Sequence, residues 1–312
     1  MSCKFALWLP LTACLAAVWT CGSPRSTSVG YDPAQAVHGN FSGQKAHEWA
    51  AKIVGFGPRP SGSAALEKTR GFFEDELKAL GWETRRQAFE DATPRGRIKF
   101  VNVRARFPGG DTWSRGVPLV AASHYDTKHF SNVIFAGAND GASGNALMLE
   151  LARITAARPA LARRMELVFF DGEEAVINYT LTDGLHGSRH YQQFLRTLSS
   201  DVRPKFGVVF DMVGDRNLRI QPPSNSSQRL LGLVLQAASE ADTRSHFGAS
   251  PSEILDDHVP LAAAGLEVTN FIDFDFPAWH TSGDTLEKIS PASLEVAGKT
   301  AALFIEKYLL GE

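Results

Sequence analysis

The chain has 312 residues, a formal net charge of −2 and a hydrophobic fraction of 44%. This length and composition suit one large α/β domain built around a single core. The near-neutral charge and the lack of a basic run give no sign of a nucleic-acid partner. No stretch reaches the roughly 20 apolar residues that a membrane-spanning helix needs.

Residues 1–24 have the form of an export signal rather than of a folded helix. Lys4 precedes an apolar stretch of about 15 residues, which is followed by small residues. Cys21 closes the stretch LAAVWTC, which resembles a bacterial lipoprotein cleavage box, although Trp19 and Thr20 fit that box poorly. We therefore expect export to the bacterial periplasm or cell envelope. Two forms remain open, a released protein and one attached to the membrane only through a lipid on Cys21.

The next segment, residues 25–44, is rich in Gly, Ser and Pro, and we expect it to form a flexible tether. The folded domain is then expected to span residues 45–312. Cys3 and Cys14 fall within the leader, so the mature chain keeps at most Cys21. This count excludes an intrachain disulfide, a catalytic thiolate in the domain and a cysteine-rich zinc finger.

The domain begins with a predicted helix and then alternates apolar strands with amphipathic helices. Leu66, Phe73, Leu77 and Leu80 share one helical face, and Gly81 ends that helix. Half-buried strands are predicted at 82–91 and 97–107, buried strands at 117–126, 164–171, 205–215 and 266–274, and helices at 141–158, 187–198, 226–241 and 290–310. This order predicts a single domain with a mixed, mostly parallel central sheet and helices on both faces.

Polar side chains collect at the downstream end of each buried strand. Because ligands bind beyond the carboxyl ends of the strands in open α/β sheets, we expect five separate segments to converge at one edge. The residues concerned are His124 with Asp126, Asp140, Glu173 with Glu174, Asp211, and His280. Two imidazoles with several carboxylates form a ligand set for a borderline divalent metal, with zinc as the first choice.

The spacing of these residues suggests different tasks for neighbours. Asp126 follows His124 by two residues, so both side chains point the same way on a strand and Asp126 is expected to accept the second ring N–H of His124. Glu173 and Glu174 are adjacent and cannot both point at one metal in regular structure. One of them is therefore expected to bind the metal, while the other carries protons.

Several motifs of the chain resemble the zinc aminopeptidase superfamily from about residue 45 to residue 308. They are HYDTK, GANDGASGNALMLELAR, ELVFFDGEEA, GLHGSRHY, FDMVGD and WHTSGDTLEKIS. DDHVPLAAAG, FPAWHT and HYDTKHF further resemble the glutaminyl cyclase branch, here in its bacterial form. GANDGASG is closer to the aminopeptidase form, Tyr179 stands where the animal cyclases have a tryptophan, and the disulfide of the secreted animal enzymes is absent.

The resemblance implies a zinc exopeptidase architecture and a defined ligand set. Asp140, Glu174 and His280 would hold one zinc ion. In the aminopeptidases His124 and Asp211 complete a second zinc site, whereas in the cyclases their equivalents persist without a second metal. One zinc is therefore expected for a cyclase and two for an aminopeptidase.

Under the cyclase interpretation, the substrate is the N-terminus of a peptide or protein that begins with glutamine, and the products are pyroglutamate and ammonia. The resemblance implies that Glu173 transfers the proton and that Asp256 and Asp211 belong to the same acidic network. It implies a substrate pocket formed by Trp279, Phe276 and Tyr179. Under the alternative interpretation, a di-zinc aminopeptidase, Glu173 deprotonates a water molecule that attacks the first peptide bond. A binding protein with a dead site is disfavoured because every residue of this set is present.

Overall fold

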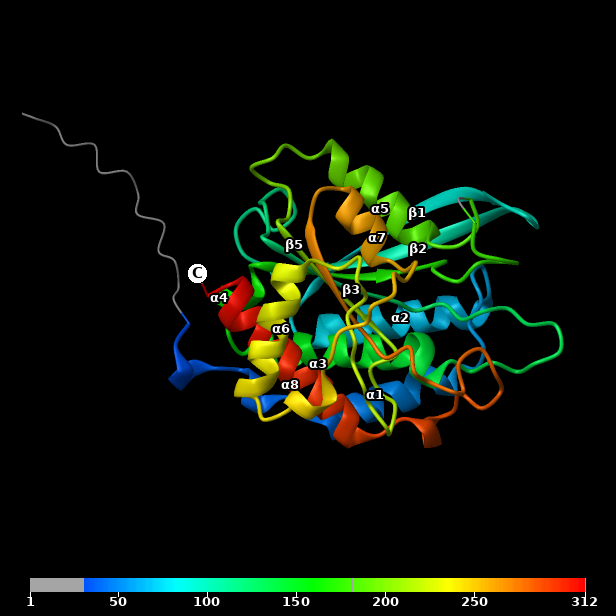
Figure 1. The fold of residues 1–312 in the computed structure, drawn as a ribbon. Coiled ribbons are helices and arrows are strands. Elements are labelled where there is room, and N and C mark those ends of the chain that lie inside the picture. Colours follow the sequence, from blue (N-terminus) through cyan, green and yellow to red (C-terminus); the bar gives the residue numbers. More distant parts are fainter. Residues whose placement is uncertain (1–30, 181, 312) are drawn as a thin grey trace, which may run out of the picture.

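The computed structural model describes residues 31–180 and 182–311 (Figure 1). The predicted leader, Cys21 and the first part of the predicted tether lie outside the described residues. The strands are β1 Glu83–Thr93, β2 Gly96–Arg106, β3 Leu119–His124, β4 Met165–Phe170, β5 Phe206–Asp211 and β6 Glu267–Ile272. The helices are α1 Gly43–Gly55, α2 Ala64–Ala79, α3 Gly144–Ala156, α4 Pro159–Ala162, α5 His186–Thr197, α6 Gln228–Glu240, α7 His258–Ala263 and α8 Pro291–Leu303. Within this part of the chain, no helix combines the length and hydropathy that crossing a membrane requires.

The six strands form one sheet in the order β1-β2-β4-β3-β5-β6. β3 pairs in parallel with both β4 and β5, and β5 pairs in parallel with β6. β2 pairs antiparallel with β1 and with β4. The predicted mixed, mostly parallel sheet is therefore confirmed, and the carboxyl ends of β3, β4, β5 and β6 meet at one edge.

Side chains of the central strands alternate between two apolar cores. Leu119 and Ala121 of β3 face the larger core, together with residues of α1, α2, α3, α6 and α8. Val120 and Ala122 face the smaller core, which α5 and α7 cover. Figure 1 shows α5 and α7 on one side of the sheet and α1, α2, α3 and α8 on the other. Helices therefore cover both faces, as predicted, and burial of both faces explains the continuous apolar runs of these strands.

The helix predictions are confirmed in position, with three additions and one break. Ser63 caps α2 by accepting a hydrogen bond from the backbone N–H of Leu66. Ser290 caps α8 and Pro291 occupies its first turn, but the α-helix ends at Leu303 and continues as the π-helical segment Phe304–Leu309. Helices α1, α4 and α7 were not predicted.

The segment from residue 31 to residue 42 packs onto α8 and the π-helical turn after it. Val37 and Phe41 are each 3% exposed. The backbone N–H of Val37 donates to Glu306 Oε2 at 3.0 Å. The ring of Phe41 lies so close to Gly298 that an added Cβ would meet it at 2.0 Å. The prediction of a flexible tether is therefore wrong from residue 31 onward, because apolar side chains hold this segment on the domain.

Candidate metal centre and its cavity

The four parallel strands and the turns after them bring the predicted ligand residues to one place. His124 is the last residue of β3, and Asp211 is the last residue of β5. Asp140 lies at the kink in segment Ala138–Ser143, which leads into α3, and its backbone there is not helical (φ −82°, ψ 100°). Glu174 follows β4 and His280 follows β6. All five segments that the sequence assigned to this edge therefore bring a ligand residue to the same place.

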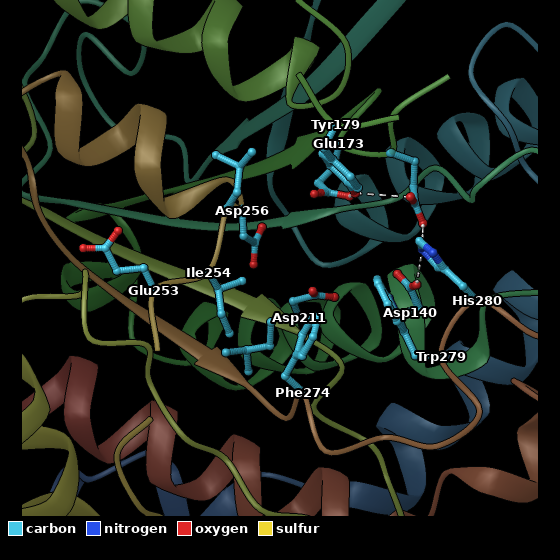
Figure 2. A pocket seen from close by; sticks show the side chains of 13 residues that line it. Asp140, Glu173, Tyr179, Asp211, Glu253, Ile254, Asp256, Phe274, Trp279 and His280 are labelled. Carbon is cyan, nitrogen blue, oxygen red and sulfur yellow. Dashed lines mark hydrogen bonds and ion pairs between the residues drawn. The ribbon is translucent and has the colours of Figure 1, made fainter. Parts of the chain in front are cut away.

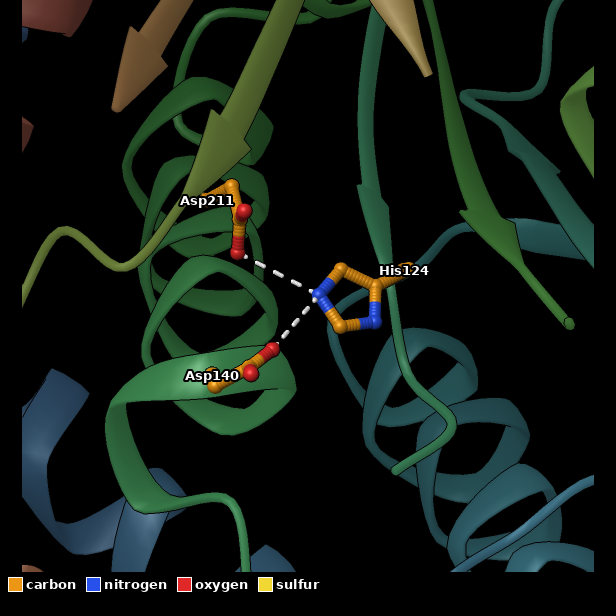
Figure 3. A group of neighbouring side chains, drawn as sticks. All are labelled: His124, Asp140 and Asp211. Atoms are coloured by element: carbon orange, nitrogen blue, oxygen red, sulfur yellow. Dashed lines mark hydrogen bonds and ion pairs between the residues drawn. The ribbon is translucent and has the colours of Figure 1, made fainter. Parts of the chain in front are cut away.

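The residues form two triads that share Asp140. In the cavity triad, which comprises Asp140, Glu174 and His280, the ligand atoms lie within 4.8 Å of one another. His280 Nε2 is 3.0 Å from Glu174 Oε1 and 3.4 Å from Asp140 Oδ2 (Figure 2). In the inner triad, which comprises His124, Asp140 and Asp211, His124 Nε2 is 3.2 Å from one oxygen of each carboxylate (Figure 3).

The cavity triad fits a divalent metal ion. Asp140 Oδ2 is buried and has no hydrogen-bond partner within the described part of the chain. A buried carboxylate oxygen without a partner costs free energy unless a cation or a donor satisfies it. Imidazole nitrogen with carboxylate oxygens is a donor set for zinc and related borderline ions.

The two triads carry more buried carboxylates than positive charges. Burial raises the pKa of Glu174, and the charge of Asp140 raises it further, against the opposing imidazole of His280. Burial also raises the pKa of Asp211 to about 7, although its hydrogen bond with His124 opposes the shift. Burial disfavours the charged form of His124, yet the facing carboxylates outweigh burial and raise the pKa of this imidazole well above its usual value. A bound cation would relieve this deficit of positive charge.

Asp126 supports the site in a different way from the one predicted. Its Oδ1 lies 3.7 Å from His124 Nδ1, which is too long for a hydrogen bond. Its two oxygens instead accept the backbone N–H groups of Glu173, at 3.1 Å, and Glu174, at 3.2 Å. The prediction of a His124 partner is wrong because the turn after β4 offers two unpaired donors. Asp126 therefore orients the Glu173–Glu174 turn.

Two supporting residues escaped the sequence analysis. Asp284 accepts the backbone N–H of Asn139 at 2.7 Å and that of Asp140 at 3.0 Å, so it holds the shared ligand in place. Burial and the charge of Asp140 raise the pKa of Asp284 to about 7. Arg59, which is fully buried, donates to the carbonyls of the loops around Asp140, namely those of Gly57, Tyr125, Ala136 and Gly137. Asp284 belongs to the motif WHTSGDTLEKIS and could have been noticed there, whereas nothing in the sequence singles out Arg59.

The cavity triad opens into a cavity of about 280 Å³. Acidic groups and apolar groups share its wall (Figure 2). The acidic residues are Asp140, Glu173, Glu174, Asp211, Glu253 and Asp256, and the others are Tyr179, Ile254, Leu255, Ile272, Phe274, Trp279 and His280. His124 is only 1% exposed and does not line the cavity. The two triads therefore differ in access, because one borders the cavity and the other extends behind it.

Trp279 both lines the cavity and holds the imidazole of His280. The two rings stack with centroids 4.0 Å apart and planes inclined by 19°. His280 has a φ of 55°, a left-handed backbone conformation that costs free energy in a residue with a side chain. The edges of Phe130 and Phe135 also pack against the imidazole, each at 5.7 Å between centroids. Aromatic contacts from several directions therefore fix the ring that borders the cavity.

Phe276 does not line the cavity, and this prediction is wrong. Its side chain is 5% exposed and packs with Met212 and Ile272 beneath the wall. Phe274, two residues earlier, lines the cavity and contacts Trp279 at 5.0 Å between ring centroids. Both phenylalanines lie in the turn after β6, where no regular periodicity indicates which side chain faces the ligand.

Asp256 is held at the cavity wall by a buried hydrogen-bonded chain. Asn270 Nδ2 donates to Asp256 Oδ2 at 2.5 Å and lies 3.4 Å from His258 Nδ1. His258 Nε2 in turn lies 3.1 Å from Asn225 Oδ1. Burial lowers the pKa of His258, so the ring is neutral and can accept at one nitrogen while it donates at the other. His258, which the sequence analysis did not assign to the site, therefore supports it from behind.

Tyr179 lines the cavity next to the two glutamates that follow β4. Its hydroxyl donates to Glu173 Oε2 at 2.8 Å and lies 3.2 Å from Glu174 Oε2. Its predicted place in the pocket therefore agrees with the cavity wall, as does that of Trp279.

Comparisons with known proteins agree with this geometry. The profile of peptidase family M28 matches residues 102–305. The chain is 30% identical to a mouse glutaminyl-peptide cyclotransferase-like protein, over 80% of this chain and 72% of that protein. It is 28% identical to a glutaminyl-peptide cyclotransferase of Drosophila melanogaster, over 81% of this chain and 78% of that protein.

Solved structures show the same architecture. A glutaminyl cyclase from an Acidobacteriales bacterium superposes with a TM-score of 0.76 at 33% identity and covers 85% of this chain and 94% of that one. A Zn-dependent exopeptidase from Parabacteroides distasonis, at 24% identity, shares the fold with a TM-score of 0.75, over 85% of this chain and 98% of that one. The chain therefore belongs to peptidase family M28 and, within that family, to the glutaminyl-peptide cyclotransferase branch.

Proposed function

We propose that this protein is a zinc-dependent glutaminyl-peptide cyclotransferase, which converts an N-terminal glutamine into pyroglutamate with release of ammonia. One observation carries the proposal. A metal-ligand triad borders a cavity whose wall also contains a buried carboxylate outside the triad, that of Glu173. The glutaminyl-peptide cyclotransferases among its relatives support the choice of reaction.

Asp140, Glu174 and His280 would hold one zinc ion. Bound zinc supplies Lewis acidity, which polarises the side-chain amide carbonyl of the substrate glutamine. All three of these residues border the cavity, whereas the inner triad needs His124, which does not reach the cavity. This difference in access supports one ion in contact with the substrate.

The cavity wall suits a glutaminyl residue with a free amino group. Glu173, Asp211 and Asp256 present negative charge to an amine. Trp279 and Ile254 offer apolar surface to the methylene groups of the side chain. The two kinds of wall together orient the amine toward its own side-chain amide.

Glu173 would carry the proton during ring closure. The α-amino nitrogen forms a bond to the side-chain amide carbon, and the bond from that carbon to the amide nitrogen breaks. Glu173 takes a proton from the attacking nitrogen and delivers it to the departing nitrogen, which leaves as ammonia. The step consumes no water, and one carboxylate serves first as base and then as acid.

The inner triad supports a second candidate function, that of a di-zinc aminopeptidase. His124 Nε2 lies 3.2 Å from an oxygen of Asp140 and from one of Asp211, so a second ion would share Asp140 with the first. In that reaction Glu173 takes a proton from a water molecule, and the first peptide bond is hydrolysed.

A product assay separates the two functions. The purified protein with added zinc is incubated with peptides that begin with glutamine and with matched peptides that begin with leucine. Ammonia and free amino acids are then measured separately. We expect ammonia from the glutamine peptides with no cleavage of the first peptide bond. Release of free leucine at a comparable rate would instead favour the aminopeptidase.

We also propose export to the bacterial cell envelope, on the pattern of residues 1–24. Mass spectrometry of the mature N-terminus tests this proposal. A lipid-modified Cys21 indicates anchoring, an unmodified terminus near residue 24 indicates release, and an intact Met1 contradicts export.

A further inference from the structure

We infer that the Tyr179 hydroxyl positions the Glu173 carboxylate for proton transfer. The inference rests on the role proposed above for Glu173. Tyr179 donates to Glu173 Oε2 at 2.8 Å, and Figure 2 shows the two side chains side by side at the cavity. Within residues 31–180 and 182–311, no other side chain donates a hydrogen bond to the Glu173 carboxylate. This hydroxyl is therefore well placed to orient the carboxylate.

The hydroxyl has one proton and two carboxylates within reach. Glu174 Oε2 lies 3.2 Å from the Tyr179 oxygen, farther than Glu173 Oε2. A phenol donates a single hydrogen, so the geometry favours the nearer acceptor, Glu173. When Glu174 binds a cation, its oxygens lose negative charge to that ion, and the hydroxyl proton turns toward Glu173.

The loop that carries Tyr179 is built to keep the ring in place. The buried carboxylate of Asp183 accepts the backbone N–H groups of three successive residues, Val176 at 2.7 Å, Ile177 at 2.9 Å and Asn178 at 3.1 Å. The backbone N–H of Thr180 donates to the carbonyl of Asp183 at 3.0 Å. The loop is therefore closed on both sides of Tyr179.

The ring itself is enclosed by two further contacts. Gly184 has a φ of 90°, and an added Cβ there would meet the Tyr179 ring at 2.7 Å, so the ring lies directly on the backbone. The ammonium group of Lys128 lies 5.1 Å from the ring centroid and also donates to the carbonyl of Ala175 at 2.5 Å. A ring with so little freedom holds its hydroxyl at a fixed point beside Glu173.

The hydroxyl also stays protonated. The ordinary pKa of a tyrosine hydroxyl is about 10. The phenol is therefore a hydrogen-bond donor throughout the pH range in which an enzyme works.

The first test is Tyr179→Phe, which removes the hydroxyl and keeps the ring. We expect kcat to fall about tenfold, because a hydrogen bond to a charged group is lost, with KM changed by less than about twofold. Zinc content should stay that of the wild type. The matched control is Tyr308→Phe. Tyr308 also donates to a glutamate, Glu240, but lies away from the cavity, and this variant should keep its kcat.

The second test is a double-mutant cycle with Glu173→Gln. If the hydroxyl acts through the carboxylate, adding Tyr179→Phe to Glu173→Gln causes no further loss of the residual rate. The inference fails if the two losses multiply, if the loss in Tyr179→Phe lies wholly in KM, or if it follows a loss of zinc. For each variant of the cycle, the release of ammonia and the release of free amino acids are both measured. Amino-acid release in place of ammonia would refute the proposed function and still leave the cycle to decide the role of Tyr179.

Discussion

Strand β4 has buried carboxylates at or near both ends, and the two ends differ in the number of cationic groups that face these carboxylates. Glu166, the second residue of the strand, is fully buried between Arg104, whose Nε lies 2.5 Å from Oε1, and Arg106, whose Nε lies 2.7 Å from Oε2. Burial favours the neutral acid, but the two guanidinium groups outweigh burial and lower the pKa of Glu166. This carboxylate is neutralised by the chain itself.

Among the described residues, no arginine pairs with Glu173 or Glu174, just past the other end of β4, and Lys128 Nζ lies 4.0 Å from Glu174 Oε2. Burial raises the pKa of Glu173 well above its usual value; the charge of His124 opposes the shift, whereas the charges of Glu174, Asp256 and Asp257 add to it. The two kinds of buried acid therefore differ in the charge that faces them. Two arginines compensate the carboxylate of Glu166, whereas the carboxylates past the other end of β4 face too few cations, which suits the binding of one.

The largest effect is expected for Glu174→Ala at the unmatched end. Removing a ligand should lower zinc affinity by more than about 100-fold, because even residues that only support a ligand contribute about 10- to 100-fold. Activity should fall to background while the fold is kept. Metal analysis of the dialysed protein measures this, with His124→Gln as the matched change in the inner triad. Unchanged zinc content in Glu174→Ala would remove Glu174 from the ligand set.

Glu173→Gln separates proton transfer from metal binding at the same end. We expect turnover to fall about 10²- to 10⁴-fold, since that is the usual contribution of a general acid–base group. Zinc content and thermal stability should stay those of the wild type, because Glu173 is not a member of either triad. Steady-state kinetics with parallel metal analysis give both values. Near-normal turnover would assign the proton transfer to another group.

Glu166→Gln tests the matched end. Breaking a buried ion pair leaves two guanidinium groups uncompensated, and the free energy of unfolding should fall by about 3–5 kcal/mol. Zinc bound per folded molecule should not change. Chemical denaturation measures the first quantity and metal analysis the second. A stability like that of the wild type would mean that Arg104 and Arg106 are satisfied without Glu166.

The stabilisation that Glu166 provides should depend on pH in a definite direction. The folded pKa of Glu166 lies below its unfolded value of about 4.3, so its ion pairs stabilise the fold above that pH. This contribution is lost as the pH falls from about 4.3 through the folded pKa. The difference in unfolding free energy between the wild type and Glu166→Gln should therefore shrink below about pH 4. Denaturation curves at several pH values check this, and a constant difference would contradict it.

The smallest effect is expected for Asp284→Asn. The amide keeps one of the two acceptor oxygens that hold the backbone of Asn139 and Asp140, so the shared ligand is loosened rather than lost. Zinc affinity should fall about tenfold, the lower end of the range for residues that support a ligand. Competition with a chelator measures it. An affinity equal to that of the wild type would limit Asp284 to a role in folding.

Regular periodicity and strand ends explain why much of the architecture and the site could be predicted. The apolar runs of β3 and β4 indicated strands buried on both faces, and their ends placed His124 and Glu174 at one edge. Helix α1 carried a readable signal, since Ala46, Trp49, Ala50 and Ile53 repeat at helical spacing. Helix α7 has only six residues, which is too short for periodicity to identify.

What the sequence could not predict lies in irregular backbone. Asp126 and Phe276 sit in turns, where the direction of a side chain depends on tertiary contacts rather than on a repeat. The segment from residue 31 has the composition of a linker, yet Val37 and Phe41 are buried, and the ring of Phe41 packs on Gly298 of α8. Arg59 is missed because it acts through backbone carbonyls that only folding brings together.

The docked segment at residues 31–42 places the start of the described chain far from the cavity. Tyr31 lies beside Arg158 and Leu310, next to the short helix α4 that leads into β4, whereas the cavity lies past the opposite end of that strand. Figure 1 shows the start of the described chain and the C-terminus near each other at the left of the molecule. A bead, carrier or fusion partner joined ahead of residue 31 would thus lie at the end of the sheet opposite the cavity. The cavity of the enzyme would then stay accessible to the N-termini of peptides in solution.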